Sequence, residues 1–285
     1  MLVTGFCFLG VTITVRYTGS GIPAAEAAFI RYLVGTLFLV PVYYRIIRGS
    51  TVVPLPGIMT VRGVAHGLGV ILWFYAMARI PMAQVTALGY LTPVVVTVGA
   101  ALFLGEVLHL RRLVAVTVGF VGMLVILRPG FTEISLGQIA QLLTTPLFAV
   151  SMLLTKRLSA EAEPAVIVAS LSLVCTLTLL PLAMINWVTP TLTEVALLSL
   201  TAVFATYGHY TMTLAFRNAP LTALQPISFL QLLWATIAGI LLFDEGLDIY
   251  VVIGGGILVL SATYIAHRES VINRAEREEA VRASD

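Results

Sequence analysis

Long apolar stretches separated by short polar breaks run through the whole sequence. A stretch of about 20 apolar residues is long enough to cross the hydrocarbon core of a membrane as a helix. We delimit ten of them, at residues 2–18, 25–47, 59–79, 82–104, 110–128, 137–157, 164–188, 194–215, 221–243 and 248–267. The breaks at 20–23, 54–57, 128–130 and 218–220 contain the Gly and Pro residues typical of helix ends. The pattern predicts an all-α polytopic membrane protein with ten transmembrane helices.

The composition agrees with this pattern and excludes several classes of protein. Of the 285 residues, 59% are hydrophobic and only 11% are charged, whereas a soluble domain carries roughly a quarter charged residues. A net charge of +2 does not indicate a nucleic-acid partner. Lys156 is the only lysine and no GxxxxGK[ST] surrounds it, so no nucleotide site is expected. Cys7 and Cys175 lie in apolar stretches, which favours small core residues over a disulfide or a metal site. No cofactor and no metal are predicted.

The arginines are distributed unevenly between the two sides of the predicted bundle. If the N-terminus is cytoplasmic, twelve basic residues fall on the inner side and four, Arg16, Arg31, Arg79 and Arg128, on the outer side. Cytoplasmic connections of membrane proteins carry the excess of Lys and Arg. We therefore expect an inner-membrane protein with both termini in the cytoplasm and a charged cytoplasmic tail at 268–285.

The two halves of the chain repeat each other at one constant offset along the sequence. Pro81 and Glu106 recur at that offset as Pro220 and Glu245, together with several apolar and small residues between them. Each half holds five predicted helices, and an odd number makes the halves cross the membrane in opposite senses. We predict two inverted repeats, 1–130 and 131–267, an arrangement found in secondary transporters whose substrate site lies between the halves.

Several segments resemble the drug/metabolite transporter superfamily, in particular its EamA-like ten-helix branch. They are FYAMARIPMAQVTAL at 74–88, GYLTPVVVTVGAALFLGE at 89–106, GFVGMLVILRPG at 119–130 and the weaker copy at 214–245, with Arg31 near the start of the second apolar stretch. The resemblance covers nearly the whole chain. It implies a ten-helix inverted-repeat bundle that moves organic metabolites by alternating access.

Polar residues near the middle of the fourth and ninth stretches are the first candidates for a binding site. Gln225, Ser228 and Gln231 recur every three residues and share one helix face. The repeat offset places Thr86 on the matching face of the first half, next to Tyr90. We predict that these five residues contact the solute. Helix–helix hydrogen bonds are the alternative interpretation of the same polar faces.

Ionisable and aromatic residues within the stretches complete the predicted site. Arg31 is suited to binding a carboxylate or phosphate, or else it bonds helix-end carbonyls or Glu26. His66 and His209, with Trp73 and Tyr207, are predicted to close the cavity from the third and eighth stretches; the histidines could equally bond a neighbouring helix. Glu106 and Glu245 lie where stretches end, and for them we favour capping or pairing with an arginine such as Arg111 or Arg112 over proton transport.

The leading hypothesis is a secondary transporter for a small organic metabolite, acting as a monomer or a homodimer in the lipid bilayer. A carrier or flippase for drug-like or lipid-linked amphiphiles is the alternative within transport. An intramembrane enzyme is disfavoured because the sequence contains no HExxH, no aspartate dyad within a stretch and no Ser-His-acid arrangement. A receptor would leave the repeat and the polar faces unexplained.

Overall fold

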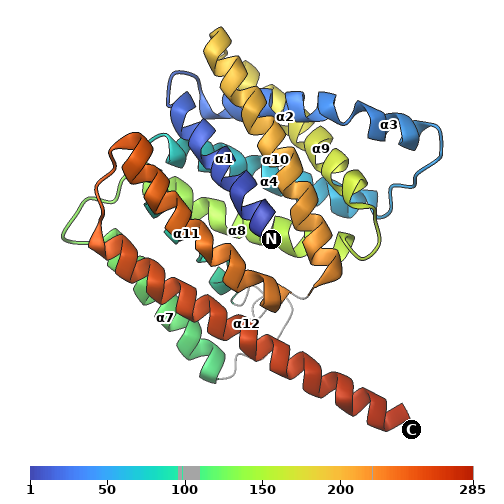
Figure 1. Cartoon of the computed structure of the whole chain (residues 1–285), viewed down its shortest axis with the longest axis vertical. Helices are drawn as coiled ribbons and strands as arrows, with labels where there is room; N and C mark the ends of the chain where they lie inside the picture. The colour runs from blue at the N-terminus through green and yellow to red at the C-terminus, as the bar shows by residue number, and fades with distance from the viewer. Residues whose placement is uncertain (96–97, 99–109, 220, 285) are drawn as a thin grey trace.

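The computed structural model of the chain is a bundle of helices (Figure 1) and describes residues 1–95, 98, 110–219 and 221–284. Within these residues the side chains of 110–112, 221–223, 225–226, 268–270 and 272–284 are not described. The helices are α1 (Leu2–Thr18), α2 (Ala24–Phe38), α3 (Val40–Ile47), α4 (Pro56–Met77), α5 (Met82–Gly89), α7 (Leu110–Leu127), α8 (Leu136–Leu158), α9 (Pro164–Met184), α10 (Leu192–Asn218), α11 (Leu221–Phe243) and α12 (Ile249–Ser284).

Among the described residues, four helices are long and apolar enough to cross a membrane: α4, α8, α9 and the Ile249–His267 part of α12. Helices α2 and α3 make a fifth span if they are taken together, although they meet at an angle of 58°. Pro41 in the first turn of α3 explains the break, because it has no N–H to continue the hydrogen bonds of α2. The protein is therefore a polytopic helical membrane protein, and ten crossings remain a prediction.

Two antiparallel helix pairs form the centre of the bundle, α1 with α10 and α4 with α8. Thr14 bonds Thr201 at 2.7 Å and Thr4 bonds Thr211 at 2.9 Å, so α1 and α10 run in opposite directions. In the second pair, Ser151 of α8 bonds His66 of α4 at 3.0 Å. Hydrogen bonds between helices matter here because lipid provides no hydrophobic drive for helix association.

Helices α7 and α12 lie side by side at one edge of the bundle (Figure 1). Their backbones touch: a Cβ added at Gly254 would lie 2.6 Å from the carbonyl oxygen of Gly122, and one at Gly122 would lie 2.9 Å from that of Gly254. Small residues at an interface allow such close approach of two membrane helices. Beyond the apolar part of α12, the helix continues to Ser284 through the segment that we predicted as a charged tail.

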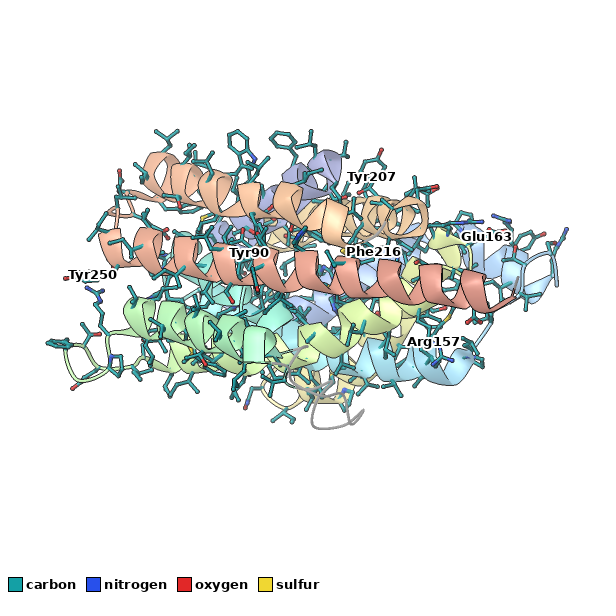
Figure 2. The ribbon with its side chains drawn as sticks, turned by 90° about the horizontal axis from the view of Figure 1, so that it is seen from below. Tyr90, Arg157, Glu163, Tyr207, Phe216 and Tyr250 are labelled. Atoms are coloured by element: carbon teal, nitrogen blue, oxygen red, sulfur yellow. The ribbon has the colours of Figure 1, made fainter. Side chains whose placement is uncertain are left out.

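The long axes of the helices define two ends of the bundle. Figure 2 shows Tyr250 at one end and Arg157 and Glu163 at the other, with Tyr90 between them. At the Tyr250 end, an ion pair of 2.7 Å joins Arg128 to Asp248. At the other end, Arg45 and Glu163 form an exposed ion pair of 3.4 Å.

Candidate functional site

A central cavity of about 390 Å³ lies between the inner helices of the bundle. Helices α1, α4, α8, α10 and α11, together with α5 and the residues after it, provide most of its lining. The cavity brings together eight residues that the sequence predicted for the site: Arg31, His66, Trp73, Thr86, Tyr90, His209, Ser228 and Gln231. Its volume falls within the usual range for small-molecule sites, roughly 300–1,000 Å³.

Two further predicted site residues are not among these eight. The side chain of Gln225 lies outside the described residues. Tyr207 is 55% exposed and lines a separate groove with Phe38, Val203 and Tyr210 on the outer side of the bundle. Successive residues of an α-helix are turned by about 100°, so Tyr207 and His209 point in nearly opposite directions from α10. We expected Tyr207 to close the cavity, but in the structure it lines the outer groove instead.

His66 and His209 both line the cavity, and their rings are in contact. The rings of His66 and His209 make an edge-to-face contact with centroids 5.1 Å apart, and His66 also stacks on Phe148 at 5.0 Å with an interplanar angle of 24°. His66 Nδ1 and the Ser151 hydroxyl share a hydrogen bond of 3.0 Å. His66 therefore connects α4 to α8 and also presents part of its ring to the cavity.

Tyr90 ties the end of α5 to the backbone of α11. Its hydroxyl accepts a hydrogen bond from the N–H of Leu232 at 3.0 Å and lies 3.3 Å from the carbonyl of Ser228, to which it can donate. It also lies 3.2 Å from the carbonyl of Phe229, to which it can donate instead. The Tyr90 ring meets Phe229 edge to face, with centroids 5.0 Å apart. Tyr90 thus lines the cavity and also fixes the position of α11.

Gln231 contacts the backbone of α1 as well as the cavity. With the amide turned so that its nitrogen faces Gly5, the amide N donates to the carbonyl of Gly5 at 3.0 Å and the amide O accepts from the N–H of Leu9 at 3.2 Å. A Cβ at Gly5 would lie 3.6 Å from the amide, an ordinary van der Waals distance, so the contact does not depend on glycine. Gln231 therefore makes the helix–helix contact that was the alternative interpretation, from a position that still borders the cavity.

Three buried polar atoms in the cavity lining have no hydrogen-bond partner in the described part of the protein. They are Nη1 of Arg31, Oε1 of Gln141 and Nδ1 of His209. Buried polar groups are nearly always satisfied in folded proteins, so each exception needs an explanation. A polar solute in the cavity could accept a hydrogen bond from Arg31 Nη1 and donate one to Gln141 Oε1.

Sequence reasoning missed the contribution of α1 and α8. On α8, Gln141, Thr144, Thr145 and Phe148 line the cavity, joined by Ser151, Met152 and Thr155 further along the same helix. Spacings of three and four residues place these side chains on one helix face. That polar stripe was visible in the sequence, but a buried polar stripe fits a contact between helices equally well.

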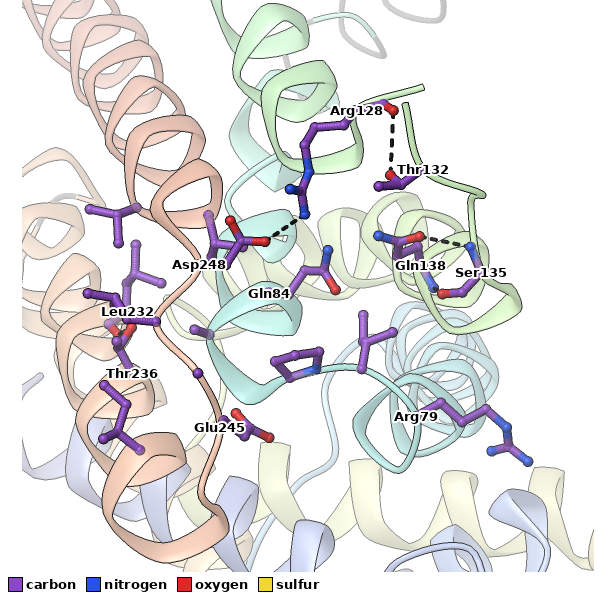
Figure 3. Close-up of a pocket in the computed structure, with 18 of the residues that line it drawn as sticks. Arg79, Gln84, Arg128, Thr132, Ser135, Gln138, Leu232, Thr236, Glu245 and Asp248 are labelled. Atoms are coloured by element: carbon purple, nitrogen blue, oxygen red, sulfur yellow. Dashed lines mark hydrogen bonds and ion pairs between the residues drawn. The ribbon is translucent and has the colours of Figure 1, made fainter. Parts of the chain in front are cut away.

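A second pocket, of about 770 Å³, opens near the Tyr250 end (Figure 3). The Arg128–Asp248 ion pair and the hydrogen bond from Ser135 N to Gln138 Oε1 lie in its wall. On α5, Ala83 and Gln84 face this pocket whereas Val85 and Thr86 face the central cavity, and Phe229 borders both. The α5 helix and Phe229 therefore lie between the two spaces.

Glu245 joins three segments on the wall of this second pocket. One carboxylate oxygen lies 2.8 Å from Nη2 of Arg16, and the other accepts a hydrogen bond of 2.9 Å from the N–H of Met82. Nη1 of Arg16 donates to the carbonyl of Met77 at 2.7 Å. The expected capping and arginine pairing of Glu245 are thus observed, with Arg16 as the partner. Glu106, its predicted counterpart, lies outside the described residues.

Comparison with known proteins identifies the relatives of this chain. Curated relatives include a riboflavin transporter of Rhizobium johnstonii, 29% identical over 94% of this chain and 90% of its own length. An S-adenosylmethionine uptake transporter of Rickettsia prowazekii is 25% identical over 89% of this chain and 86% of its own length. The pseudopaline exporter CntI of Pseudomonas aeruginosa is 29% identical, with 91% and 92% covered.

A crystal structure of another protein has the same fold. Its TM-score is 0.61 and its sequence identity 15%, and the match covers 94% of this chain and 96% of that one. The model of the EamA-like transporter family matches twice, at residues 1–128 and 135–266. These matches span nearly the whole sequence, including every described residue that lines the central cavity. The chain belongs to the EamA-like transporter family.

Proposed function

We propose that this protein carries a small organic solute across the cytoplasmic membrane by alternating access, and that it is not an enzyme. The observation that carries the proposal is the central cavity, where a membrane helix bundle leaves Arg31 Nη1 and Gln141 Oε1 buried without partners among the described residues. A bundle that served only as a scaffold would gain stability by pairing these groups or by replacing them with apolar ones. Membership of a transporter family supports the same function.

The proposal includes two inverted repeats, residues 1–130 and 131–267. A pair of matching contacts supports them. Near the end of α1, Arg16 donates to the carbonyls of Met77 and Ile80; near the end of α8, Lys156 donates to those of Phe216 and Ala219. Each acceptor in the second set follows its counterpart by the repeat offset, the same separation that relates Pro81 to Pro220. The two halves therefore use the same connection between corresponding helices.

Contacts between equivalent residues support a two-fold axis through the cavity wall. Tyr90 and Phe229 are related by the repeat offset, and their rings are in contact. Equivalent positions of two repeats can touch only near the axis that relates them. The family model, which matches once in each half, is consistent with the same division. A solute site next to such an axis is typical of inverted-repeat transporters.

The cavity extends toward one end of the bundle. Its lining includes Met1 and Thr4 of the first helix but not Val15 or Arg16, and it includes Phe216 near the end of α10. At the opposite end, Arg16 and Glu245 connect α1 to the segment that follows α11. This arrangement supports a state open toward the side of Met1 and closed at the Glu245 end. Alternating access would require these contacts to open.

Counterflow into proteoliposomes tests the carrier function. Riboflavin, S-adenosylmethionine and nicotinate serve as labelled probes, and recovery of the solute unchanged separates transport from catalysis. Gly89→Leu fills the cavity, since Gln141, at 3.6 Å, is the only described residue within 4 Å of a Cβ at Gly89. We expect this variant to fold and to lose the counterflow of any transported probe. Gly57→Leu is the matched control, because no atom of the described residues lies within 4 Å of a Cβ at Gly57. Equal counterflow in both variants would contradict a transport path through this cavity.

The proposed orientation places both termini in the cytoplasm, because twelve basic residues lie on that side and four on the other. We expect Thr189→Cys to react with an impermeant thiol reagent from outside intact cells and Ser50→Cys to remain unlabelled. Both positions are exposed, whereas the native Cys7 and Cys175 are buried and contribute little background. The reverse labelling pattern would refute the orientation.

A further inference from the structure

Arg31 is a buried cation in the wall of the central cavity. It is 6% exposed, and its Nη1 has no hydrogen-bond partner in the described part of the chain. Its guanidinium lies over the ring of Tyr32, 3.8 Å from the centroid. None of the ion pairs between described residues includes Arg31, and no described residue in the cavity lining is Asp or Glu. Among the described residues, therefore, no neighbouring carboxylate neutralises the charge of Arg31.

A second buried arginine adds to the positive charge of this region. Arg62 precedes His66 by one turn of α4 and is 1% exposed. Its Nη1 donates to the carbonyl of Ile167 at 3.0 Å, while its Nε and Nη2 have no partner among the described residues. Glu26, on the same helix as Arg31, instead accepts a hydrogen bond from the N–H of Val188. Burying unpaired charge is costly, and a bound anion would offset that cost.

Flat rings line the same cavity as Arg31. His66 stacks on Phe148, and Phe8 meets His209 edge to face with centroids 5.2 Å apart. Trp73 also lines the cavity. Aromatic faces favour planar partners, which can stack on them or meet their edges. The volume of about 390 Å³ suits a solute of one or two rings.

We propose that the cavity binds a planar aromatic solute that carries one anionic group, a carboxylate or a phosphate. Arg31 holds the anionic group, and the ring lies among His66, Phe148 and Trp73. Oε1 of Gln141 accepts a hydrogen bond from an N–H or O–H of the solute. This inference rests on the proposed carrier function and defines the chemical class of its substrate.

Binding to the purified full-length protein by calorimetry tests the proposal with matched pairs of probes. Nicotinate is compared with nicotinamide, benzoate with benzamide, and phenyl phosphate with phenol. We expect at least one anion to bind about tenfold or more tightly than its neutral partner, because hydrogen bonds to charged groups are the stronger ones. A preference for phenyl phosphate over phenol without one for nicotinate or benzoate over the amides would indicate a phosphate site, and the reverse would indicate a carboxylate site. This comparison needs no variant.

Variants then assign the preference to Arg31. Arg31→Gln should remove the preference for the anion, Arg31→Lys should retain part of it, and Arg217→Gln, at an exposed arginine of α10, should leave it unchanged. Equal affinity of the folded wild-type protein for acids and neutral partners, no binding of any anion at millimolar concentration, or a preference that survives Arg31→Gln would overturn the proposal. Anion binding without counterflow would instead contradict only the carrier function. Counterflow of neutral probes alone would contradict only the substrate class.

Discussion

Replacing Glu245 with glutamine should destabilise the protein by about 2–4 kcal/mol, because it leaves the Arg16 guanidinium without its counter-ion in a largely buried position. The side chains of Arg16 and Glu245 are 20% and 8% exposed, and their closest atoms are 2.8 Å apart. Glutamine keeps an oxygen that can accept the hydrogen bond from Met82 N, so the change isolates the charge. Unfolding in mild detergent, followed by intrinsic fluorescence, measures the loss.

Glu163→Gln is the matched control for this substitution. It removes the carboxylate that pairs with Arg45, just as Glu245→Gln removes the carboxylate that pairs with Arg16. The Arg45–Glu163 pair, however, is about half exposed, and its closest atoms are 3.4 Å apart. Exposed ion pairs contribute roughly 0–1 kcal/mol, so this variant should unfold almost as the wild type does. Similar losses in both variants would show that Glu245 does not act through a buried charge pair. A double-mutant cycle with Arg16→Gln measures the coupling directly.

The second large effect is expected at the contact between α7 and α12. In Gly254→Ala, the new Cβ would lie 2.6 Å from the carbonyl oxygen of Gly122 and 2.6 Å from Cγ1 of Ile126. The backbone oxygen cannot move aside without separating the two helices. Overpacking of this kind typically costs about 1–3 kcal/mol. Thermal unfolding of the purified protein should therefore begin at a lower temperature.

Gly256→Ala provides the control two residues further along the same helix. In the described part of the protein, no atom lies within 4 Å of a Cβ at Gly256, so alanine meets no described neighbour there. Alanine also favours a helix over glycine by up to about 1 kcal/mol. We expect this variant to be as stable as the wild type or slightly more stable. If Gly254→Ala behaved in the same way, the close contact between α7 and α12 would be disproved.

The helical elements could be predicted from the sequence because their signal is local. An apolar stretch interrupted by Gly and Pro specifies a helix and its ends within a few residues. The predicted stretch 137–157 corresponds to α8 (Leu136–Leu158), and the stretch 221–243 coincides with α11 (Leu221–Phe243). The bend between α2 and α3 was absent from the prediction, which took 25–47 as one helix although Pro41 marks the break.

The partners of individual side chains could not be predicted in the same way. Arg16 lies in the first helix and Glu245 near the last one, and no periodic pattern connects them. Gln231 was considered both for solute binding and for helix contact, and only the position of α1 shows that its amide bonds Gly5 and Leu9. Tyr207 was grouped with His209, but α10 turns the two side chains toward different neighbours.

The sequence by itself therefore determined the class of the protein, its helical stretches and part of the polar lining of the cavity. Hydrophobicity and charge act residue by residue along the chain, so they can be summed without knowledge of packing. The tertiary structure alone decided which polar groups pair with each other and which remain open to the cavity. Arg31 lies in the middle of α2 and Arg128 directly follows α7; Arg128 pairs with Asp248 whereas Nη1 of Arg31 has no partner among the described residues. That difference depends on how helices distant in sequence pack together, which is the reason local patterns do not contain it.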